Sequence, residues 1–507
     1  MIRQSGRLLT ALLALLLLAA PLPFGGVTPW AAALLRAACF ALLLLAAVAV
    51  DSLPALRPAI VPAAALAAFA LLGLAQAAPL PAGLVAAISP EHARLEQQAR
   101  SAGAAAAAAE PPRLTVAALA TRSAALGWAA AAAVFLAAVA AGRRREQRRC
   151  LAGAVLAGAL FQVFFGARDW FARAHTLWGV ELPATAVRMR GTFVNPNHLA
   201  VYLEMALPVA FAWGAWAIRR ARDEPQADRR VLLVAPPVML WLTLFAGLSF
   251  TGSRGGLLAA VAAVTVQGVL SARVRKRWWL APLGALAALV GLVVVATVGF
   301  REGLGRWLTT SVADVSLGAR LREYGAVLEL WRRFPATGSG LGTFRDAFPL
   351  VQTPELQGTF WHPHSDLLEV LATAGLVGAA LLAAGLFALV RRLAAVLAEG
   401  FRSEDRAAAL AAFGVLTSLG LHEALDFGLT MPGNAVTLAV LLGSVAAARL
   451  RDSSTQLDPA RKHLPAAKAL ELQHVKPTPD RRRHPQGGRR SYDPPHRENS
   501  HGRAVEP

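Results

Sequence analysis

Long uncharged apolar runs recur along this chain, and they constrain its fold more than any other feature of the sequence. Each run is close to the ~20 residues that an α-helix needs to cross the hydrocarbon core of a membrane. Hydrophobic residues make up 56% of the 507 residues, and the mean hydropathy is +0.47. We therefore expect an all-α polytopic membrane protein with about twelve transmembrane helices. The predicted helices are 8–24, 30–50, 58–78, 123–141, 150–166, 197–218, 231–250, 254–271, 278–298, 365–390, 407–425 and 433–450.

The orientation of these helices follows from the short loops between them. The first apolar run follows Arg3 and Arg7, a pattern that is also typical of a signal peptide. Because further predicted spans follow at once, we interpret it as an uncleaved first helix. The basic short loops all fall on one side of the predicted bundle: 143–149, 219–230, 273–277 and 391–406. The positive-inside rule makes that side cytoplasmic, and both termini are expected on the same side.

The opposite face carries three segments that are too long to be simple turns between helices: 79–122, 167–196 and 299–364. Function is expected in these segments. The first contains an alanine-rich stretch at 101–110, which we interpret as a helical surface element without evident chemistry.

The composition changes after about residue 452, where the chain becomes rich in Arg, Pro and Gly. We predict a transmembrane domain over residues 1–451 and a disordered basic cytoplasmic tail over residues 452–507. Attraction to anionic membrane lipids accounts for the net charge of +20, so no nucleic-acid partner is expected. Two cysteines, Cys39 and Cys150, are too few and too badly placed for a disulfide framework.

Residues 362–378, HPHSDLLEVLATAGLVG, place titratable groups directly before a long apolar helix. Asp366 is predicted to be the N-cap of this helix, with Glu369 at the third helical position in a capping-box arrangement. His364 then lies on the last irregular residues before the helix, where its side chain can reach water or a lipid headgroup.

The same stretch has a specific spacing, in which His364 and Ser365 are followed by nine residues and then by Gly375 and Gly378. The glycines are expected to let this helix approach another helix closely. The spacing resembles the signature at the end of the large periplasmic loop of bacterial O-antigen ligases. Further segments resemble motifs of this ligase and polymerase superfamily in the expected order: GTFVNPNHLAVYLEMALP at 191–208, TGSRGG at 251–256 and RLREYGAVLELWRRFPATGSGLGTF at 320–344.

The resemblance implies a membrane glycosyltransferase of the C type, with a large periplasmic loop between spans 9 and 10. It implies an active site that faces the periplasm at the bacterial inner membrane. The implied reaction is inverting transfer of a glycan from undecaprenyl diphosphate to an acceptor hydroxyl, such as one on lipid A–core. A diphosphate is already a good leaving group, so the reaction needs cations for the diphosphate and a base for the hydroxyl, and no cofactor is expected.

The resemblance assigns the role of base to His364 and the diphosphate contacts to Arg254 and Arg320. Arg188 and Arg190 are further diphosphate candidates, because they precede the first motif on the outer face, where the positive-inside rule disfavours arginine. The planar guanidinium fork matches two phosphoryl oxygens. An arginine between two spans can also simply snorkel to the interface, so Arg254 keeps a structural interpretation beside the functional one.

The remaining arginines of the third motif are weaker candidates for substrate binding. Arg322, Arg332 and Arg333 have the acidic neighbours Glu323 and Glu329, and this pattern is typical of a salt-bridged solvent face of a helix.

Asn197 and His198 belong to the turn that enters the sixth span, directly after Pro196. Asn197 can cap that helix, and contact of Asn197 or His198 with a sugar or phosphate is the functional alternative. The glycine-rich stretch 336–344 lacks the Gly-Lys-Ser/Thr ending of a nucleotide-binding loop, so no nucleotide is expected there. Its glycines are expected to let the backbone pack close to the membrane surface or a lipid headgroup.

A metal site is the main alternative to the arginine-and-histidine chemistry, because His362, His364 and Asp366 alternate and could present their side chains to one ion. Pro363 limits how the two histidines can converge, and Asp366 is better used as the helix cap. The arginines already supply positive charge, so we expect a metal-independent enzyme.

Two other functional classes stay open at this point. A polysaccharide polymerase or a protein O-oligosaccharyltransferase of the same superfamily would use the same donor with another acceptor. A transporter is less favoured, because His422, Glu423 and Asp426 form the only titratable cluster within a predicted helix and the sequence shows no inverted repeat.

Overall fold

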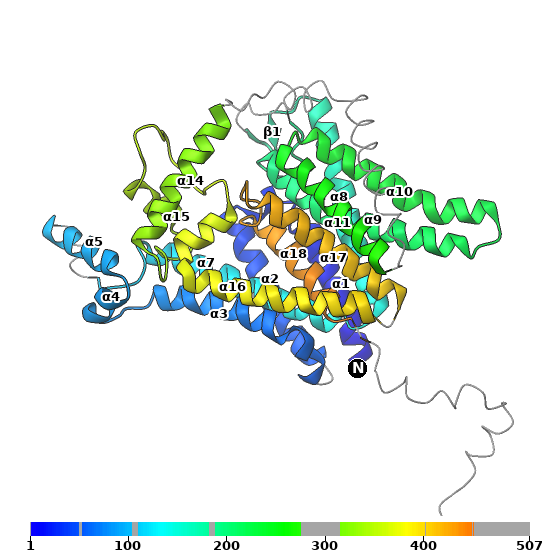
Figure 1. The fold of residues 1–507 in the computed structure, drawn as a ribbon, viewed down its shortest axis with the longest axis horizontal. Helices are drawn as coiled ribbons and strands as arrows, with labels where there is room; N and C mark the ends of the chain where they lie inside the picture. The colour runs from blue at the N-terminus through cyan, green and yellow to red at the C-terminus, as the bar shows by residue number, and fades with distance from the viewer. Residues whose placement is uncertain are drawn as a thin grey trace, which may run out of the picture. The chain divides into compact units, whose positions relative to one another are not determined.

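The computed structural model describes residues 2–49, 53–103, 110–181, 188–274, 315–400, 402–448 and 450 (Figure 1). Two predicted features lie outside these residues, namely the ninth span at 278–298 and the tail at 452–507, and so do residues 104–109 of the predicted alanine-rich surface element at 101–110. The description of the predicted large loop begins at Val315.

Helices make up nearly all the regular structure of the described residues, which confirms the all-α membrane class. Within those residues, eight helices are long and apolar enough to cross a membrane. The exact number of spans stays a prediction. The helices that coincide with predicted spans are α1 (Ile2–Ala19), α2 (Pro29–Ala49), α3 (Ile60–Gln76), α7 (Ala118–Ala141), α8 (Arg145–Phe171), α9 (Pro196–Arg222), α10 (Ala227–Phe250), α11 (Arg254–Val274), α16 (Asp366–Glu399), α17 (Ser403–His422) and α18 (Pro432–Ala446).

Shorter elements fill the connections between these helices. The helical ones are η1 (Phe24–Gly26), η2 (Leu53–Ala59), α4 (Ala82–Ile88), α5 (Pro90–Ser101), α14 (Val315–Arg333), α15 (Phe344–Ala347) and η4 (Phe348–Leu350). Strands β1 (Thr176–Leu177) and β2 (Val180–Glu181) form a small antiparallel hairpin in which Thr176 pairs with Glu181 and Leu177 with Val180. Most of these elements belong to the segments that the sequence predicts on the outer face.

The helix α9 lies at the centre of the packing, with 67% of its most apolar stretch buried. It packs against α10, α11 and α17. Small residues bring these helices together: a Cβ added at Gly414 of α17 would lie 2.6 Å from Cβ of Pro208 in α9. Close backbone approach of this kind is typical of helix packing in membranes, where small residues and van der Waals contact drive association.

The helix α16 is capped by Ser365, so the prediction of Asp366 as N-cap is wrong. Ser365 has an extended backbone (φ −168°, ψ 112°), and its hydroxyl accepts a hydrogen bond from the Leu368 amide at 3.3 Å. Asp366 is the first helical residue, and its carboxylate accepts a hydrogen bond from the Leu429 amide at 3.0 Å. The Asp366 carboxylate therefore binds the loop after α17, and the Ser365 hydroxyl caps the helix.

Two glycines of α16 act differently from each other. Gly378 lets α16 approach α3, since an added Cβ would lie 2.9 Å from the Phe69 ring, and this confirms the predicted close approach (Figure 1). Gly375 interrupts the helix with φ 64°, and an added Cβ would lie 2.6 Å from the Gly338 amide nitrogen. A left-handed residue in so tight a contact is suited to glycine alone.

A group of ion pairs joins the start of α8 to the start of α17. Arg148 pairs with Asp405, and both side chains are buried. Arg145 and Arg149 pair with Glu404 at 3.2 and 2.6 Å. The basic loop 143–149 and the start of α17 therefore lie at the same end of the helices.

Candidate functional site

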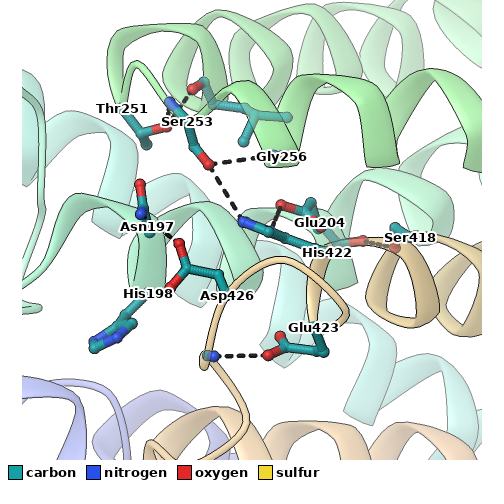
Figure 2. Close-up of polar contacts among 12 residues, drawn as sticks. Asn197, His198, Glu204, Thr251, Ser253, Gly256, Ser418, His422, Glu423 and Asp426 are labelled. Atoms are coloured by element: carbon teal, nitrogen blue, oxygen red, sulfur yellow. Dashed lines mark hydrogen bonds and ion pairs between the residues drawn. The ribbon is translucent and has the colours of Figure 1, made fainter. Parts of the chain in front are cut away.

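The loop that follows α17 contacts the first turn of α9 and the helix α14, and both contacts involve Asp426 (Figure 2). Asn197, in the first turn of α9, donates to Oδ2 of Asp426 at 2.5 Å. Nη2 of Arg320, on α14, lies 3.9 Å from the same oxygen, and Nη1 of Arg320 donates to the Leu425 carbonyl at 3.1 Å. One carboxylate thus connects α9 with a candidate diphosphate-binding arginine.

The side chain of Asn197 joins this network and does not cap α9, so the predicted cap is wrong. Asn195 is the N-cap, and its side-chain oxygen accepts from the Asn197 amide at 2.9 Å. Pro196 at the first helical position suits an extended residue before it, which leaves the cap to Asn195. The freed Asn197 oxygen accepts a hydrogen bond from Nη2 of Arg188.

Arg188 extends the network to the turn before α11. Its Nε donates to the Thr251 carbonyl at 2.6 Å, and a Cβ added at Gly252 would lie 3.2 Å from the same nitrogen. Arg254 is the first residue of α11 and follows this turn directly. The structure therefore brings Arg188 and the turn of Arg254 to the network that contains Arg320.

Arg190 lies apart from these arginines, although the sequence groups it with Arg188. Its Nη2 donates to the Ala174 carbonyl at 3.2 Å, near the end of α8, and only 6% of the residue is exposed. Neighbouring positions in this irregular segment thus face different surroundings.

His364 forms a close pair with Glu323 of α14. The distance from Nδ1 of His364 to Oε2 of Glu323 is 2.8 Å, and Glu323 is 2% exposed while the histidine side chain is 35% exposed. Tyr324 donates from its hydroxyl to the His364 carbonyl at 2.5 Å. Because an ionised carboxylate only accepts hydrogen bonds, it favours the tautomer with hydrogen on Nδ1, which leaves Nε2 as a proton acceptor.

The interpretation of Glu323 as part of a solvent face is wrong, because this side chain is buried against His364. The interpretation is confirmed for Glu329, which pairs with Arg332 at 3.5 Å and with Arg333 at 3.9 Å on the exposed side of α14. A single helix thus has a solvent face and a face that orients the histidine.

Three histidine rings surround the Phe427 ring, at centroid distances of 5.1 Å for His198, 5.2 Å for His362 and 5.7 Å for His364. His362 contacts both oxygens of Glu369, at 2.9 and 3.1 Å. Burial lowers the pKa of His362, but the hydrogen bond and charge of Glu369 outweigh burial and raise the pKa above its ordinary value. His198 is buried behind Phe427, so its imidazole packs on the loop.

The side chains of the alternative metal site point to different partners. His362 contacts Glu369, His364 contacts Glu323, and Asp366 accepts from the Leu429 amide. Over the described ranges, no three His, Cys, Asp or Glu side chains are grouped so that they could hold a metal ion.

The glycine-rich stretch 336–344 packs on protein, and its predicted contact with the membrane surface or a lipid headgroup stays a prediction. Gln76, at the end of α3, donates to the Thr337 carbonyl at 2.6 Å and accepts from the Leu341 amide at 3.0 Å. Val116 donates to the Ser339 carbonyl at 3.0 Å. The segment before α7 therefore covers this stretch, although the sequence assigns that segment no role.

A buried group of polar side chains lies beside the network, and the sequence assigns it no function (Figure 2). Nδ1 of His422 lies 2.7 Å from Oε1 of Glu204, and Nε2 of His422 lies 3.4 Å from the Ser253 hydroxyl. The sequence did contain a signal for this group, because Glu204 is a carboxylate within an otherwise uncharged predicted span. Ionisable residues within a membrane span usually mark functional sites.

Residues 238–383 match the family model described as O-antigen ligase. No protein with a curated function matches the chain. The matched range contains Arg254, Arg320, Glu323 and His364. The residues 422–426 and the whole of α9 lie outside the match and reach the same site through the fold.

Proposed function

We propose that this chain, of which residues 238–383 match the O-antigen ligase family, is a member of that family and transfers a glycan from undecaprenyl diphosphate to an acceptor hydroxyl. The family match supports a membrane glycosyltransferase-like enzyme of lipopolysaccharide or polysaccharide biosynthesis that uses a lipid-linked donor. In our proposal the acceptor is lipid A–core, and the reaction takes place on the periplasmic face of the bacterial inner membrane.

The pair formed by His364 and Glu323 carries this proposal. Glu323 lies one helical turn after Arg320, so both side chains are on the same face of α14. Glu323 orients the imidazole of His364, and Arg320 supplies a guanidinium one turn away. Base and cation are the two groups that glycan transfer from a diphosphate requires.

The proposed reaction uses Nε2 of His364 as general base. The acceptor oxygen forms a bond to the anomeric carbon of the donor as its proton passes to Nε2. The bond between the anomeric carbon and the phosphate oxygen breaks, and its electron pair leaves with the diphosphate. Attack opposite the leaving group inverts the anomeric configuration. The Glu323 carboxylate would stabilise the imidazolium that forms.

The proposed diphosphate site consists of Arg188, Arg254 and Arg320. Arg188 and Arg320 are connected through Asn197 and Asp426, and Arg254 begins the helix that follows the turn bound by Arg188. Three guanidinium groups would stabilise the charge that builds on the leaving group without a metal ion. Arg190 is left out of this site because it is buried against Ala174.

The proposal is tested with purified protein in lipid nanodiscs, a defined undecaprenyl-diphosphate-linked glycan and a lipid A–core acceptor. We expect a glycosylated acceptor of the mass that one transfer gives. Extension of the donor glycan without acceptor would show a polymerase. Flux of a lipid-linked glycan without bond formation would show a transporter, and either result would overturn the proposed ligase activity.

A further inference from the structure

Three buried polar side chains form a line that ends at the turn carrying Arg254 (Figure 2). Glu204 lies about two turns into α9, His422 is the last residue of α17, and Ser253 directly precedes α11. Their exposed fractions are 0%, 1% and 3%. Three helices that are far apart in sequence therefore meet through this line.

A carboxylate and an imidazole are costly at this depth, which makes their presence informative. A charged side chain within a membrane span costs about 2.5–3.5 kcal/mol on insertion scales, and such residues usually pair and mark functional sites. An apolar residue at the position of Glu204 would fill the same space between α9 and α17 without this cost. Packing alone therefore does not explain the Glu204–His422 pair.

The two glycines after Arg254 leave room for this pair. A Cβ added at Gly255 would lie 2.8 Å from Cδ2 of His422, and a Cβ added at Gly256 would lie 2.7 Å from Oε1 of Glu204. The first turn of α11 thus rests directly on the imidazole and the carboxylate, and any larger residue would push it away.

Ser253 connects the pair to the end of α11. Its hydroxyl accepts from the Gly256 amide at 3.2 Å, which satisfies an amide of the first turn, and the same hydroxyl lies 3.4 Å from Nε2 of His422. The Ser253 amide donates to the Thr251 hydroxyl at 3.2 Å. The backbone on both sides of Arg254 is therefore held by hydrogen bonds of Ser253, whose hydroxyl lies near His422.

We propose that Glu204 and His422 are positioning residues that hold the first turn of α11, and with it Arg254, for the diphosphate of a lipid-linked donor. This inference rests on the proposed function of Arg254. His422 is also the last residue before the loop that contains Asp426, the carboxylate that lies 3.9 Å from Arg320. The pair acts through the arginines and does not take part in proton transfer at His364.

The test measures donor binding and turnover in Glu204→Ala, His422→Ala and Glu204→Gln variants. Undecaprenyl diphosphate without a glycan is the binding probe, so binding is read without chemistry. We expect the alanine variants to bind it about 10-fold more weakly and to raise the donor KM similarly, while the acceptor KM stays unchanged. Glu204→Gln keeps an oxygen that can accept from Nδ1 of His422, so we expect a smaller effect.

The chain offers a matched control in Gln267, which joins the same three helices away from the site. Its side-chain amide, within α11, donates to the Pro208 carbonyl of α9 at 3.0 Å and to the Leu410 carbonyl of α17 at 3.1 Å. Gln267→Leu removes a buried contact between these helices, and we expect it to leave donor affinity unchanged. Equal loss of donor affinity in Gln267→Leu and Glu204→Ala would reduce the pair to a structural role.

Coupling to Arg254 gives the sharpest readout. If the pair acts through this arginine, adding Glu204→Ala to Arg254→Lys should weaken binding little further, whereas independent roles would give additive losses. Ser253→Ala provides the same test if the alanine variants at Glu204 and His422 do not fold. Wild-type protein that binds no lipid diphosphate would overturn the proposed function together with this inference. Wild-type binding with unchanged affinity in every variant would overturn the inference alone.

Discussion

The two ends of α17 carry charged groups in different arrangements. At its start, Arg148 is 9% exposed and contacts a carboxylate of Asp405 as well as the Gly142 carbonyl at 2.6 Å. Beyond its other end, Arg320 is 35% exposed, donates to a backbone carbonyl and lies 3.9 Å from the carboxylate of Asp426. The helix of 20 residues separates the two groups by about 30 Å.

This difference distinguishes an arginine that joins helices from one that is available to a ligand. A buried pair in direct contact has its charge matched within the protein, and loss of one partner leaves the other uncompensated. A half-exposed guanidinium at a long distance from its carboxylate keeps donor groups that face water, and an incoming phosphate can replace that water. We therefore expect changes at the start of α17 to affect stability and changes beyond its end to affect catalysis.

The largest effect is expected for His364→Ala. Loss of the general base should lower turnover by about 10²–10⁴-fold while the protein stays folded and inserted. Transfer by purified protein measures this loss. His175→Ala, an exposed histidine beside the hairpin β1–β2, should keep wild-type activity. Wild-type turnover by His364→Ala would remove the base from the proposed mechanism.

Arg148→Met tests the other end of α17. Removal of one partner from the buried pair with Asp405 should lower the free energy of unfolding by about 3–5 kcal/mol. Chemical unfolding in detergent micelles measures the change. Arg149→Met, whose arginine is 53% exposed in its pair with Glu404, should cost less than about 1 kcal/mol. A loss of specific activity in folded Arg148→Met would contradict the division between the two ends.

The pH dependence of stability tests how α5 packs on the glycine-rich stretch 336–344. Burial lowers the pKa of His92 to about 4, where the imidazole contacts the Ser89 hydroxyl at 2.8 Å and the Ser339 carbonyl at 3.4 Å. Between about pH 4 and pH 6.5 the unfolded chain binds more protons at this residue, so stability falls as pH decreases through that window. The loss is on the order of 3 kcal/mol.

Unfolding curves of wild type and His92→Leu isolate this contribution. The difference between their free energies of unfolding should change across that pH window and be constant above it. The contribution of His362 to stability has the opposite pH dependence, because its pKa is raised and the contribution is lost as pH rises. Both proteins contain His362, so the difference between wild type and His92→Leu reports on His92. A difference that is independent of pH would show that His92 does not titrate between the two values.

Arg254→Lys and Arg320→Lys should have a moderate effect on transfer. Lysine keeps the charge but loses the planar fork, so we expect about a 10-fold decrease in kcat/KM at each position. Arg322→Lys is the matched control, since Arg322 lies on the exposed face of α14. If both lysine variants equalled wild type, these arginines would be anchors at the membrane interface.

The smallest effect is expected for metal removal. Transfer should continue in excess EDTA and gain nothing from added Mg²⁺, Mn²⁺ or Zn²⁺, because guanidinium groups supply the positive charge. An activity that disappears in chelator, returns with one ion and is abolished in His362→Ala would replace the arginine mechanism with a metal site.

The sequence alone determined the membrane class and the positions of most described helices. Insertion depends on the length and apolarity of each run, and backbone hydrogen bonds within a helix are local, so both can be read along the chain. It also led to His364, Arg254 and Arg320 through the spacing of their motifs, and these three residues lie in the matched range 238–383.

Only the tertiary structure decided which polar groups meet. Glu204 and His422 are separated by 218 residues, and His364 and Glu323 by 41. Their pairing depends on how α9, α14 and α17 pack, since a carboxylate within a span takes whichever partner lies across the helix interface. The N-caps of α9 and α16 could not be predicted for the same reason. The side chains of Asn197 and Asp366 each form a hydrogen bond with the loop after α17 and do not cap their helices. A side chain can form a hydrogen bond either to its own helix end or to a group that is distant in sequence. The packed fold decides between the two, because a polar group that is buried without a partner costs free energy.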